Sequence, residues 1–373
     1  MAYTDIDDPT INFNTVTYTG NVDESSSNGS QAITGVGFQP DWVWIKPRTL
    51  GYAAGSHNLT DSVRGAGVGL FADLTAAEYD YGTSANGGTV TAFGSDGFTL
   101  GGASQVNEDS NTYAAWNWKA GTSFSNDASA TSVGSIDSTG SISTISGFSI
   151  VTYTGAENAG DTVAHGLGAV PSAMIIKKFS ASSEQDWIVY HHKNTGSPQD
   201  VHLNLNDNAQ TEDNNTTFND TAPTSTVFSL GSGSEINAGG ASMVAYCFTD
   251  IQGYSKFGKY LGNNKSGTAG DVDGTFIHTG FKIAWLMVKR LTNVNAGFYI
   301  WDNKRNGFNN HNFNLESNVS TAEDDGNFRV DFYSNGFKWR VNDSIVNAAE
   351  EYIYFAFAES PQVNSKGVPN NAE

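Results

Sequence analysis

The sequence predicts an all-β protein of tandem antiparallel β-sandwiches with jelly-roll-like or lectin-like connections, and three observations support this fold class. Ser, Thr and Asn are abundant beside 41 Gly, 22 Phe, 15 Tyr and 8 Trp, and only 16% of the residues are charged. This mix favours short strands joined by polar turns over helices. Large apolar residues alternate with small or polar ones over short runs, as in strands packed on one face. The third observation is an internal repeat.

One stretch recurs three times along the chain. Its copies are 37–46 (GFQPDWVWIK), 168–177 (GAVPSAMIIK) and 280–289 (GFKIAWLMVK). In each copy a glycine-containing turn leads into a short, mostly apolar run that ends at a lysine. Such a run predicts a buried strand, because a helix needs about ten or more residues. The glycine and the lysine occur in all three copies, so we expect them to be architectural.

The order of motifs around these copies predicts three modules, each spanning about one hundred residues, within the usual size of a domain. The predicted boundaries are 1–121, 148–252 and 253–361, with a linker at 122–147 and a flexible tail at 362–373. The linker is rich in Ser, Thr, Gly and Ala, a composition that buries too little surface to hold a fold. We therefore expect the first module to sit apart or to swap onto a neighbouring chain, and the other two to dock rigidly.

The formal net charge of −20, from 39 acidic and 19 basic residues, bears on the choice of partners. A strongly negative field repels phosphate backbones and anionic lipid, so we expect neither nucleic acid nor a membrane surface as partner. No run approaches the roughly eighteen apolar residues that a membrane helix needs. The first residues contain no basic region followed by an apolar one, so no signal peptide is expected. Cys247 is the single cysteine and lies in an apolar run, which predicts a buried, inert thiol.

The sequence contains no pattern typical of a catalytic site. Glu350 and Glu351 are adjacent, as are Asp324 and Asp325, and adjacent residues of a strand point to opposite faces. A retaining glycosidase needs two carboxyls about five ångströms apart across a cleft. No Gly-x-Ser-x-Gly elbow occurs, and Cys247 has no evident histidine partner. We therefore expect a protein that is not an enzyme.

Oxygen-rich loops are the weak candidates for a metal site. Asp271 and Asp273 lie in one such loop, and residues 204–208 form another. Calcium takes about six to eight oxygen ligands in a flexible geometry and would suit these loops, and ordinary Asx turns are the alternative. His191 and His192 are adjacent and make a poor metal pair. No cofactor is predicted, and calcium is the one ion that would fit.

Two groups of residues are candidates for binding through charge or hydrogen bonds. Arg64 and Arg305 each follow an aspartate by three residues, at matching places of the first and third modules. A bidentate grip on a ligand carboxylate or on a partner chain is one interpretation, and an internal ion pair at a strand end is the other. Gln39, Asp41 and Trp42 change or lose their partners in the later copies of the repeat. A contact specific to the first module is therefore expected beside these three.

Exposed aromatic side chains beside Asn, Asp and Gln would suit the binding of glycans. The candidates are Tyr52, Tyr79, Tyr81, Trp187 and Trp339. Each of them could instead belong to a core or an interface, and the sequence does not separate these roles.

Several motifs resemble repeats found in tail and other virion-surface proteins of tailed bacteriophages, especially marine ones. They are Val-Thr-Tyr-Thr-Gly (16–20), the stretch 37–46, Asp-Ser-Val-Arg-Gly (61–65), Ser-Asp-Gly-Phe-Thr-Leu-Gly (95–101) and Ala-Trp-Asn-Trp-Lys-Ala-Gly (115–121). Later segments are similar to modules that follow in the same proteins, so the resemblance covers nearly the whole chain. It implies concanavalin-like or lectin-like sandwiches on a particle surface.

From this resemblance we expect a structural or adhesion protein on the virion surface, made in the host cytoplasm. Its expected partners are host-surface glycan or other virion proteins, and a homo-oligomer such as a trimer is expected. The chain shows no separate tail-anchoring domain and no long fibrous shaft, which leaves a head fibre, a capsid decoration protein and a small adhesin open beside a tail fibre. A particle-borne polysaccharide hydrolase is the alternative from another class.

Overall fold

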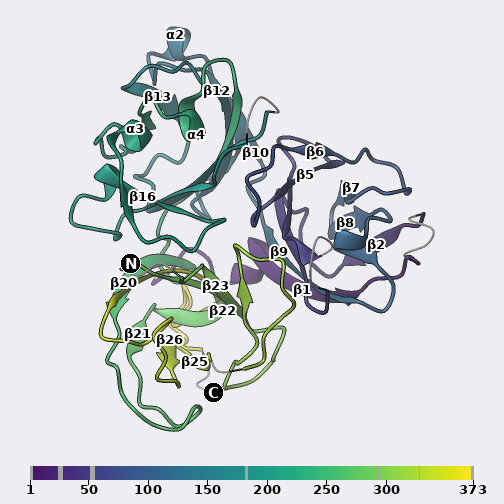
Figure 1. Ribbon diagram of the computed structural model, residues 1–373, viewed down its shortest axis with the longest axis vertical. Helices are drawn as coiled ribbons and strands as arrows, with labels where there is room; N and C mark the ends of the chain where they lie inside the picture. The colour runs from purple at the N-terminus through teal and green to yellow at the C-terminus, as the bar shows by residue number, and fades with distance from the viewer. Residues whose placement is uncertain are drawn as a thin grey trace.

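The computed structural model describes residues 3–23, 28–50, 55–180, 184–292, 295–326 and 328–370. Its strands form six sheets, a larger and a smaller one in each of three successive parts of the chain, which we call lobes 1, 2 and 3. Figure 1 shows the lobes arranged around a common centre. The predicted all-β class is confirmed. In the described ranges, no helix is long and apolar enough to cross a membrane.

Lobe 1 pairs a six-stranded sheet with a three-stranded one. In spatial order, the larger sheet consists of β1 (Phe13–Thr19), β9 (Thr112–Trp118), β3 (Trp42–Pro47), β4 (Asn58–Asp61), β5 (Val68–Phe71) and β6 (Tyr79–Asp80). The smaller sheet consists of β2 (Gln31–Thr34), β8 (Gly97–Leu100) and β7 (Val90–Gly94). The short helices are η1 (Pro9–Ile11) and α1 (Ser104–Asn107).

Lobe 2 pairs an eight-stranded sheet with a two-stranded one. The larger sheet consists of β10 (Thr122–Asn126), β11 (Ser138–Ser143), β12 (Phe148–Thr154), β19 (Ser242–Phe248), β14 (Ala173–Lys178), β15 (Ile188–His191), β16 (Val201–Asn204) and β17 (Glu212–Asp213). The smaller sheet consists of β13 (Asp161–Ala164) and β18 (Val227–Leu230). The short helices are α2 (Ala128–Thr131), η3 (Pro198–Asp200), α3 (Asn215–Phe218) and α4 (Ser234–Asn237).

Lobe 3 pairs a five-stranded sheet with a three-stranded one. The larger sheet consists of β20 (Ser255–Leu261), β27 (Glu351–Pro361), β22 (Phe281–Arg290), β23 (Tyr299–Asp302) and β24 (Leu315–Glu316). The smaller sheet consists of β21 (Phe276–His278), β26 (Gly336–Trp339) and β25 (Val330–Tyr333).

The three copies of the repeated stretch form the equivalent strands β3, β14 and β22, each inside its larger sheet. The prediction of buried strands is confirmed, since β3 and β14 are buried along their whole length. The repeated glycines have positive backbone φ angles, of 89° at Gly37, 70° at Gly168 and 87° at Gly280. Glycine adopts this conformation without the steric cost that a Cβ brings, which explains why it occurs in every copy.

The central strands of each larger sheet are buried on both faces. One face packs on the smaller sheet of its own lobe, as where Val163 and Phe228 meet Met174 in lobe 2. The opposite faces of the three larger sheets meet in a central core rich in aromatic residues. There the rings of Trp42 and Tyr246 stack with centroids 4.3 Å apart. This core joins the three lobes into one body.

The expectation that the first module sits apart is wrong. Rings from lobe 1 pack directly on lobe 3, with centroids 5.6 Å apart for Trp118 and Trp285 and 5.7 Å apart for Trp118 and Phe357. The physical reason is that the outer face of the lobe 1 sheet carries large aromatic side chains, which must be covered to be removed from water.

The predicted linker at 122–147 also needs correction, because it forms β10, α2 and β11 and extends the larger sheet of lobe 2. β11 pairs with β12 over six residues, with Ser138 opposite Tyr153 at one end. Backbone hydrogen bonds and small hydroxyl side chains are enough for strands added to the edge of an existing sheet. A composition poor in large apolar residues therefore did not prevent folding.

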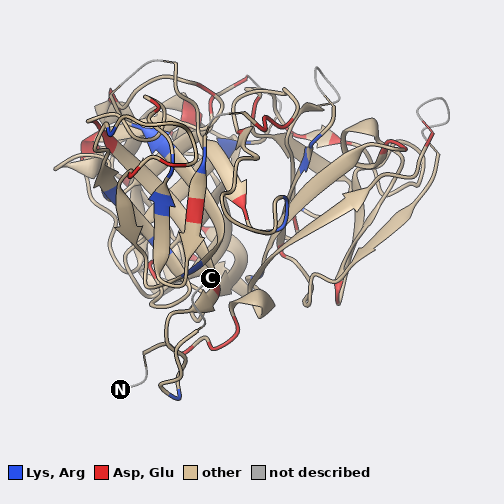
Figure 2. Cartoon of the chain, turned by 90° about the horizontal axis from the view of Figure 1, so that it is seen from below, with Lys and Arg blue, Asp and Glu red and all other residues tan. Residues whose placement is uncertain are grey.

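The predicted flexible tail is tied to the body over its described part. The backbone N and side-chain Oγ of Ser365 each donate to the Asp7 carboxylate over 2.6 Å. Asn370 Nδ2 donates to Ser334 O over 2.9 Å. Both chain ends lie toward the same side of the molecule (Figure 2). Residues 371–373 of the predicted tail lie outside the described residues.

Candidate binding grooves at the lobe junctions

Neighbouring lobes meet at three junctions, 1/2, 2/3 and 3/1, which are built from equivalent residues. The same backbone hydrogen bond occurs in each: Glu78 N to Phe179 O (3.0 Å), Thr211 N to Leu291 O (3.2 Å) and Glu323 N to Arg48 O (2.8 Å). Every acceptor lies two residues after the lysine of the repeated stretch. The lobes are therefore related by an approximate threefold arrangement.

The repeated lysines Lys46, Lys177 and Lys289 are buried at these junctions. Lys46 Nζ donates to Thr321 O of lobe 3 over 2.7 Å, and Lys177 Nζ donates to Thr75 O of lobe 1 over 2.7 Å. Burial disfavours the charged form and lowers the pKa of all three lysines to about 8. Lys289 Nζ donates to Ala296 O of its own lobe. All three lysines are thus structural, as the sequence indicated, and Lys46 and Lys177 also link neighbouring lobes.

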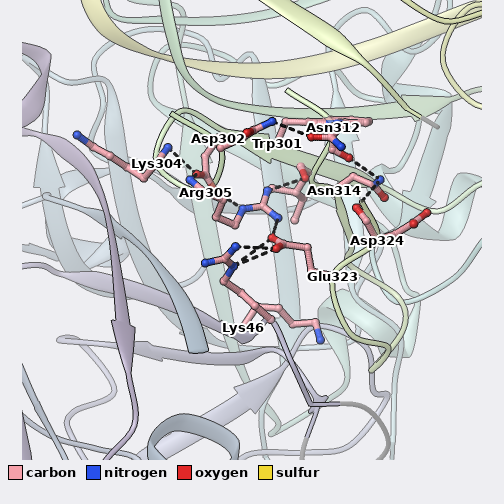
Figure 3. Close-up of polar contacts among 12 residues, drawn as sticks. Lys46, Trp301, Asp302, Lys304, Arg305, Asn312, Asn314, Glu323 and Asp324 are labelled. Atoms are coloured by element: carbon pink, nitrogen blue, oxygen red, sulfur yellow. Dashed lines mark hydrogen bonds and ion pairs between the residues drawn. The ribbon is translucent and has the colours of Figure 1, made fainter. Parts of the chain in front are cut away.

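At junction 3/1 a buried ion-pair network contains one of the predicted arginines (Figure 3). Arg305 Nε lies 2.6 Å from the Asp302 carboxylate and its Nη1 lies 2.7 Å from Glu323. Trp116 of lobe 1 donates its Nε1–H to Asp302 over 2.9 Å. Burial alone would raise the pKa of Asp302, but the Arg305 charge and these hydrogen bonds outweigh it and hold the pKa below its usual value.

Junction 1/2 has the same arrangement around the other predicted arginine. Arg64 lies 2.6 Å from both Asp61 and Glu78, and its side chain is only 2% exposed. Tyr246 of lobe 2 donates its hydroxyl to Asp61 over 2.7 Å, as Trp116 does at junction 3/1. For both arginines the structure supports the interpretation of an internal ion pair. Neither guanidinium is free to grip a ligand from solvent.

Junction 2/3 replaces this charged network with neutral groups. His191, Asn194 and Thr211 occupy the places of the aspartate, the arginine and the glutamate. Thr211 Oγ1 donates to Asn194 Oδ1 over 2.7 Å, and His191 Nε2 donates to Tyr354 O over 3.2 Å. Burial lowers the pKa of His191 to about 3, so this ring is neutral near pH 7. The aromatic residue that faces His191 is Phe355, which has no polar donor.

The predicted group Gln39, Asp41 and Trp42 does not form a site open to solvent. Asp41 is buried and accepts hydrogen bonds from Ser62 Oγ (2.7 Å) and from the backbone N of Ala120 (2.8 Å). Trp42 belongs to the central core. Gln39 alone is exposed.

The predicted aromatic candidates separate into buried and accessible ones. Trp187 is fully buried, and its Nε1–H donates to Phe71 O across junction 1/2 over 2.8 Å. Trp339 is fully buried in the core of lobe 3. The prediction that these two tryptophans bind glycan is therefore wrong, because their rings are covered by protein. Tyr79 is 51% exposed and Tyr81 is half-buried, whereas Tyr52 lies outside the described residues.

The weak metal candidates are not brought together. Asp271 and Asp273 are exposed, and Asp273 forms an ion pair with Lys338. Within the part of the chain that the structure describes, no group of three or more His, Cys, Asp or Glu side chains is placed to hold a metal ion. The predicted buried thiol is confirmed, since Cys247 is fully buried and burial raises its pKa to about 12.

Open grooves lie beside two of the junctions, at equivalent places. The groove at junction 1/2 has a cavity volume of about 380 Å³, and the groove at junction 2/3 has one of about 600 Å³. Val63 lines the first and Lys193 lines the second, and each stands next to the residue that occupies the arginine position. The opposite wall is β12 in the first groove and β20 in the second.

The two grooves differ in the charge of their lining residues and in whether the strand that forms the opposite wall lies at the edge of its sheet. Groove 1/2 is lined by hydroxyl groups of β11 and β12 together with Arg64, Glu78 and Asp137. Groove 2/3 is lined by the lysines 193, 256 and 259 and by one carboxylate, that of Asp250. β12 is covered by β11, whereas β20 is the edge strand of its sheet. Elsewhere, carboxylates are spread over many loops of the molecule (Figure 2).

A family defined by a domain of unknown function, DUF7483, matches residues 8–361 of this chain. The chain belongs to the DUF7483 family. The match spans all three lobes, so the domain of this family is the whole three-lobed body. Comparisons with curated proteins and with solved structures found no match.

Sequence reasoning missed the lysines of groove 2/3 and the phenylalanine beside them. Lys193 comes from lobe 2, whereas Lys256, Lys259 and Phe276 come from β20 and β21 of lobe 3, so the groove forms only when the two lobes pack together. A signal was present at Lys193, because the second repeat carries His191, His192 and Lys193 where the first and third carry the start of an Asp-x-x-Arg motif. The loss of the ion pair in one repeat marked the junction that differs from the others.

Proposed function

We propose that this DUF7483 chain is a non-enzymatic binding protein on the surface of a tailed-phage particle. There it contacts host-surface glycan or another virion protein. The observation that carries this proposal is the presence of open grooves at the junctions of a body whose lobes share one buried core. A body of this kind holds its grooves in a preformed geometry, so little conformational freedom is lost on binding.

The motifs that resemble phage surface proteins support the proposal through their places in the body. The stretch 37–46 includes β3, and 61–65 includes the buried pair Asp61 and Arg64. Both belong to the architecture that joins the lobes. A resemblance carried by such residues indicates a shared body, on which groove and loop residues can differ between proteins that bind different targets.

Locating the chain in purified particles tests the surface role. An antibody against the purified protein, or a density map of the particle at the level of single chains, is expected to place it on the outside of head or tail. Its absence from purified particles would contradict the proposal. A homo-oligomer such as a trimer is also part of the proposal, and the mass of the purified protein in solution measures it.

Binding to host cells separates the two surface roles. Saturable binding of labelled protein to host cells, lost after the surface glycan is removed enzymatically, supports adhesion. Absence of binding to host cells, together with presence of the protein on the capsid, supports a decoration role. Release of sugar from host polysaccharide, abolished by substitution of one acidic residue, would replace both with a hydrolase.

A further inference from the structure

Groove 2/3 differs from its counterpart in ways that point to a ligand. Lys193 is exposed, and the Lys193 and Lys256 ammonium groups have no hydrogen bond or ion pair with any described residue. Lys259 forms an exposed ion pair with Glu351 at 2.8 Å. Such a pair is weak, so an anionic ligand can replace Glu351 as the partner of Lys259. In a chain with a net charge of −20, this group of lysines creates a local site for an anion.

The groove also offers an aromatic surface. The Phe276 side chain is 45% exposed, and its ring contacts Tyr333 edge to face at 6.0 Å. A partly exposed ring beside polar groups suits the apolar face of a sugar, because such rings bury area without losing a hydrogen bond.

The backbone of β20 limits what can bind along it. The N–H of Phe257 donates to Asp250 over 2.9 Å, and its carbonyl accepts from His192 Nε2 over 2.7 Å. Because outward-facing groups alternate along an antiparallel strand, the N–H and C=O of Lys259 also point away from β27. The carbonyl of Leu261 is taken by Thr275 Oγ1 at 3.1 Å. Phe257 therefore has neither backbone group free and the carbonyl of Leu261 is taken, so β20 lacks the run of free groups that an added peptide strand needs.

We infer that groove 2/3 binds a carboxylated polysaccharide, with its carboxylates on Lys193 and Lys256 and a sugar face on Phe276. This inference rests on the proposed function and names the class of glycan. Groove 1/2, which holds Glu78 and Asp137 in place of lysines, does not take the same ligand.

The test measures the binding of carboxylated oligosaccharides to the full chain by calorimetry. The probes are oligogalacturonate, oligoalginate and oligosialate, with maltooligosaccharide of similar length as the neutral control. We expect at least one carboxylated probe to bind with an affinity that falls as salt is added, and the neutral probe not to bind. Absence of binding to every carboxylated probe at low salt overturns the inference.

Matched substitutions locate the site. The double change Lys193→Gln and Lys256→Gln is expected to weaken binding roughly five- to tenfold, as expected for the loss of two accessible ion pairs. The change Lys265→Gln with Lys366→Gln removes the same charge from exposed positions elsewhere and is expected to leave affinity unchanged. Equal weakening by both pairs overturns the site, since net charge alone would then explain it.

A second pair of variants tests the aromatic surface. Phe276→Ala is expected to weaken binding of the carboxylated probe, whereas Phe308→Ala, at a side chain that is 73% exposed elsewhere, is expected to leave it unchanged. Binding of polyglutamate as tight as that of the saccharide, unaffected by Phe276→Ala, overturns the choice of a glycan in favour of an acidic peptide.

The outcomes separate this inference from the proposed function. If the protein binds host cells but none of the carboxylated probes, the surface role is supported and the inference about groove 2/3 is contradicted. If the protein binds the probes through the lysines but is absent from purified particles, ligand binding by groove 2/3 is supported and the surface role is contradicted.

Discussion

At the scale of single residues, Arg64 and Arg305 show how one buried side chain links two lobes. Each guanidinium bridges two carboxylates, and in each case one of these carboxylates also accepts a hydrogen bond from the neighbouring lobe. Taking such groups out of water is costly, and good geometry repays the cost only while every partner is present. The networks therefore make correct docking a condition for satisfying buried charge.

Removing one partner of this network is expected to be strongly destabilising. Asp302→Ala leaves the fully buried Arg305 with Glu323, which it shares with Arg48, as its remaining carboxylate, and it leaves the Trp116 Nε1–H without its acceptor. It should lower the free energy of unfolding by roughly 3 to 5 kcal/mol. Urea unfolding followed by tryptophan fluorescence measures the loss. Lys259→Gln breaks an exposed pair and is the matched control, with an expected loss below about 1 kcal/mol. A similarly small loss for Asp302→Ala would show that the network does not hold junction 3/1.

The neutral junction carries its own dependence on pH. The pKa of His191 is about 3 in the folded protein because of burial, and an unfolded histidine titrates near 6.5. Between these values the unfolded chain binds a proton that the folded protein does not, so stability falls as the pH drops below about 6.5. At pH 5 this proton uptake should lower the free energy of unfolding by about 2 kcal/mol relative to neutral pH.

This prediction is checked by comparing unfolding free energies at pH 7 and pH 5. His191→Gln is expected to lose about 2 kcal/mol less than the wild type over this interval. His278→Gln changes an exposed ring and leaves His191 in place, so it serves as the control. Equal pH dependence in His191→Gln and the wild type would contradict the assignment.

Residue identity alone could not show which aromatic side chains are accessible. Trp187 was a candidate platform for sugar and Trp42 a candidate contact of the first module, but other lobes cover the faces of the two sheets on which these side chains lie. That cover comes from residues far away in the sequence. Asp61 and Arg64, by contrast, lie three residues apart, and their spacing already indicated an internal pair.

At the scale of elements, the repeated strand was the most predictable part of the molecule. Its glycine, its apolar run and its lysine are local features, and β3, β14 and β22 confirm them. The strands β10 and β11 were not predicted, because β11 is held by pairing with β12 and β10 by pairing with β11, rather than by their own side chains. Composition is a weak guide for a strand at the edge of a sheet.

The lysines that end these strands predict an unusual rise in stability at alkaline pH. The pKa of Lys177 is about 8 when folded, and an unfolded lysine titrates near 10.4, so in between the unfolded chain binds more protons. The three buried lysines should therefore increase stability with pH through this window. The buried Cys247 thiol, whose folded pKa is about 12, offsets part of the rise above about pH 8.5, and the tyrosines oppose it above about pH 10.

The variant Lys177→Met isolates this effect. The gain in unfolding free energy between pH 8 and pH 9.5 is expected to be smaller than in the wild type by about 2 kcal/mol. Lys366→Met, at an exposed position, should retain the wild-type gain. A wild type that loses stability steadily over this range would contradict the burial of charged lysines at the junctions.

At the scale of the whole molecule, one chain builds an arrangement that resembles a ring of three subunits. Lobe 1 links to lobe 2 through Asp61 and Tyr246, lobe 2 links to lobe 3 through His191 and the Tyr354 carbonyl, and lobe 3 returns to lobe 1 through Asp302 and Trp116. Covalent continuity allows each link to differ, which identical subunits cannot do. The neutral junction, with a groove of larger volume, is the product of that freedom.

Because the central core belongs to all three lobes, the molecule should unfold as one cooperative unit rather than lobe by lobe. Trp285→Ala removes a ring that packs on Trp116 and Trp118 of lobe 1. It is expected to cost roughly 3 to 5 kcal/mol and to lower the stability of every lobe equally. Hydrogen exchange of the backbone amides measures this effect. Protection of β12, which lies in lobe 2 and not in the lobe of Trp285, should fall together with protection of β22. Loss of protection confined to lobe 3 would show that the lobes are independent domains that merely touch.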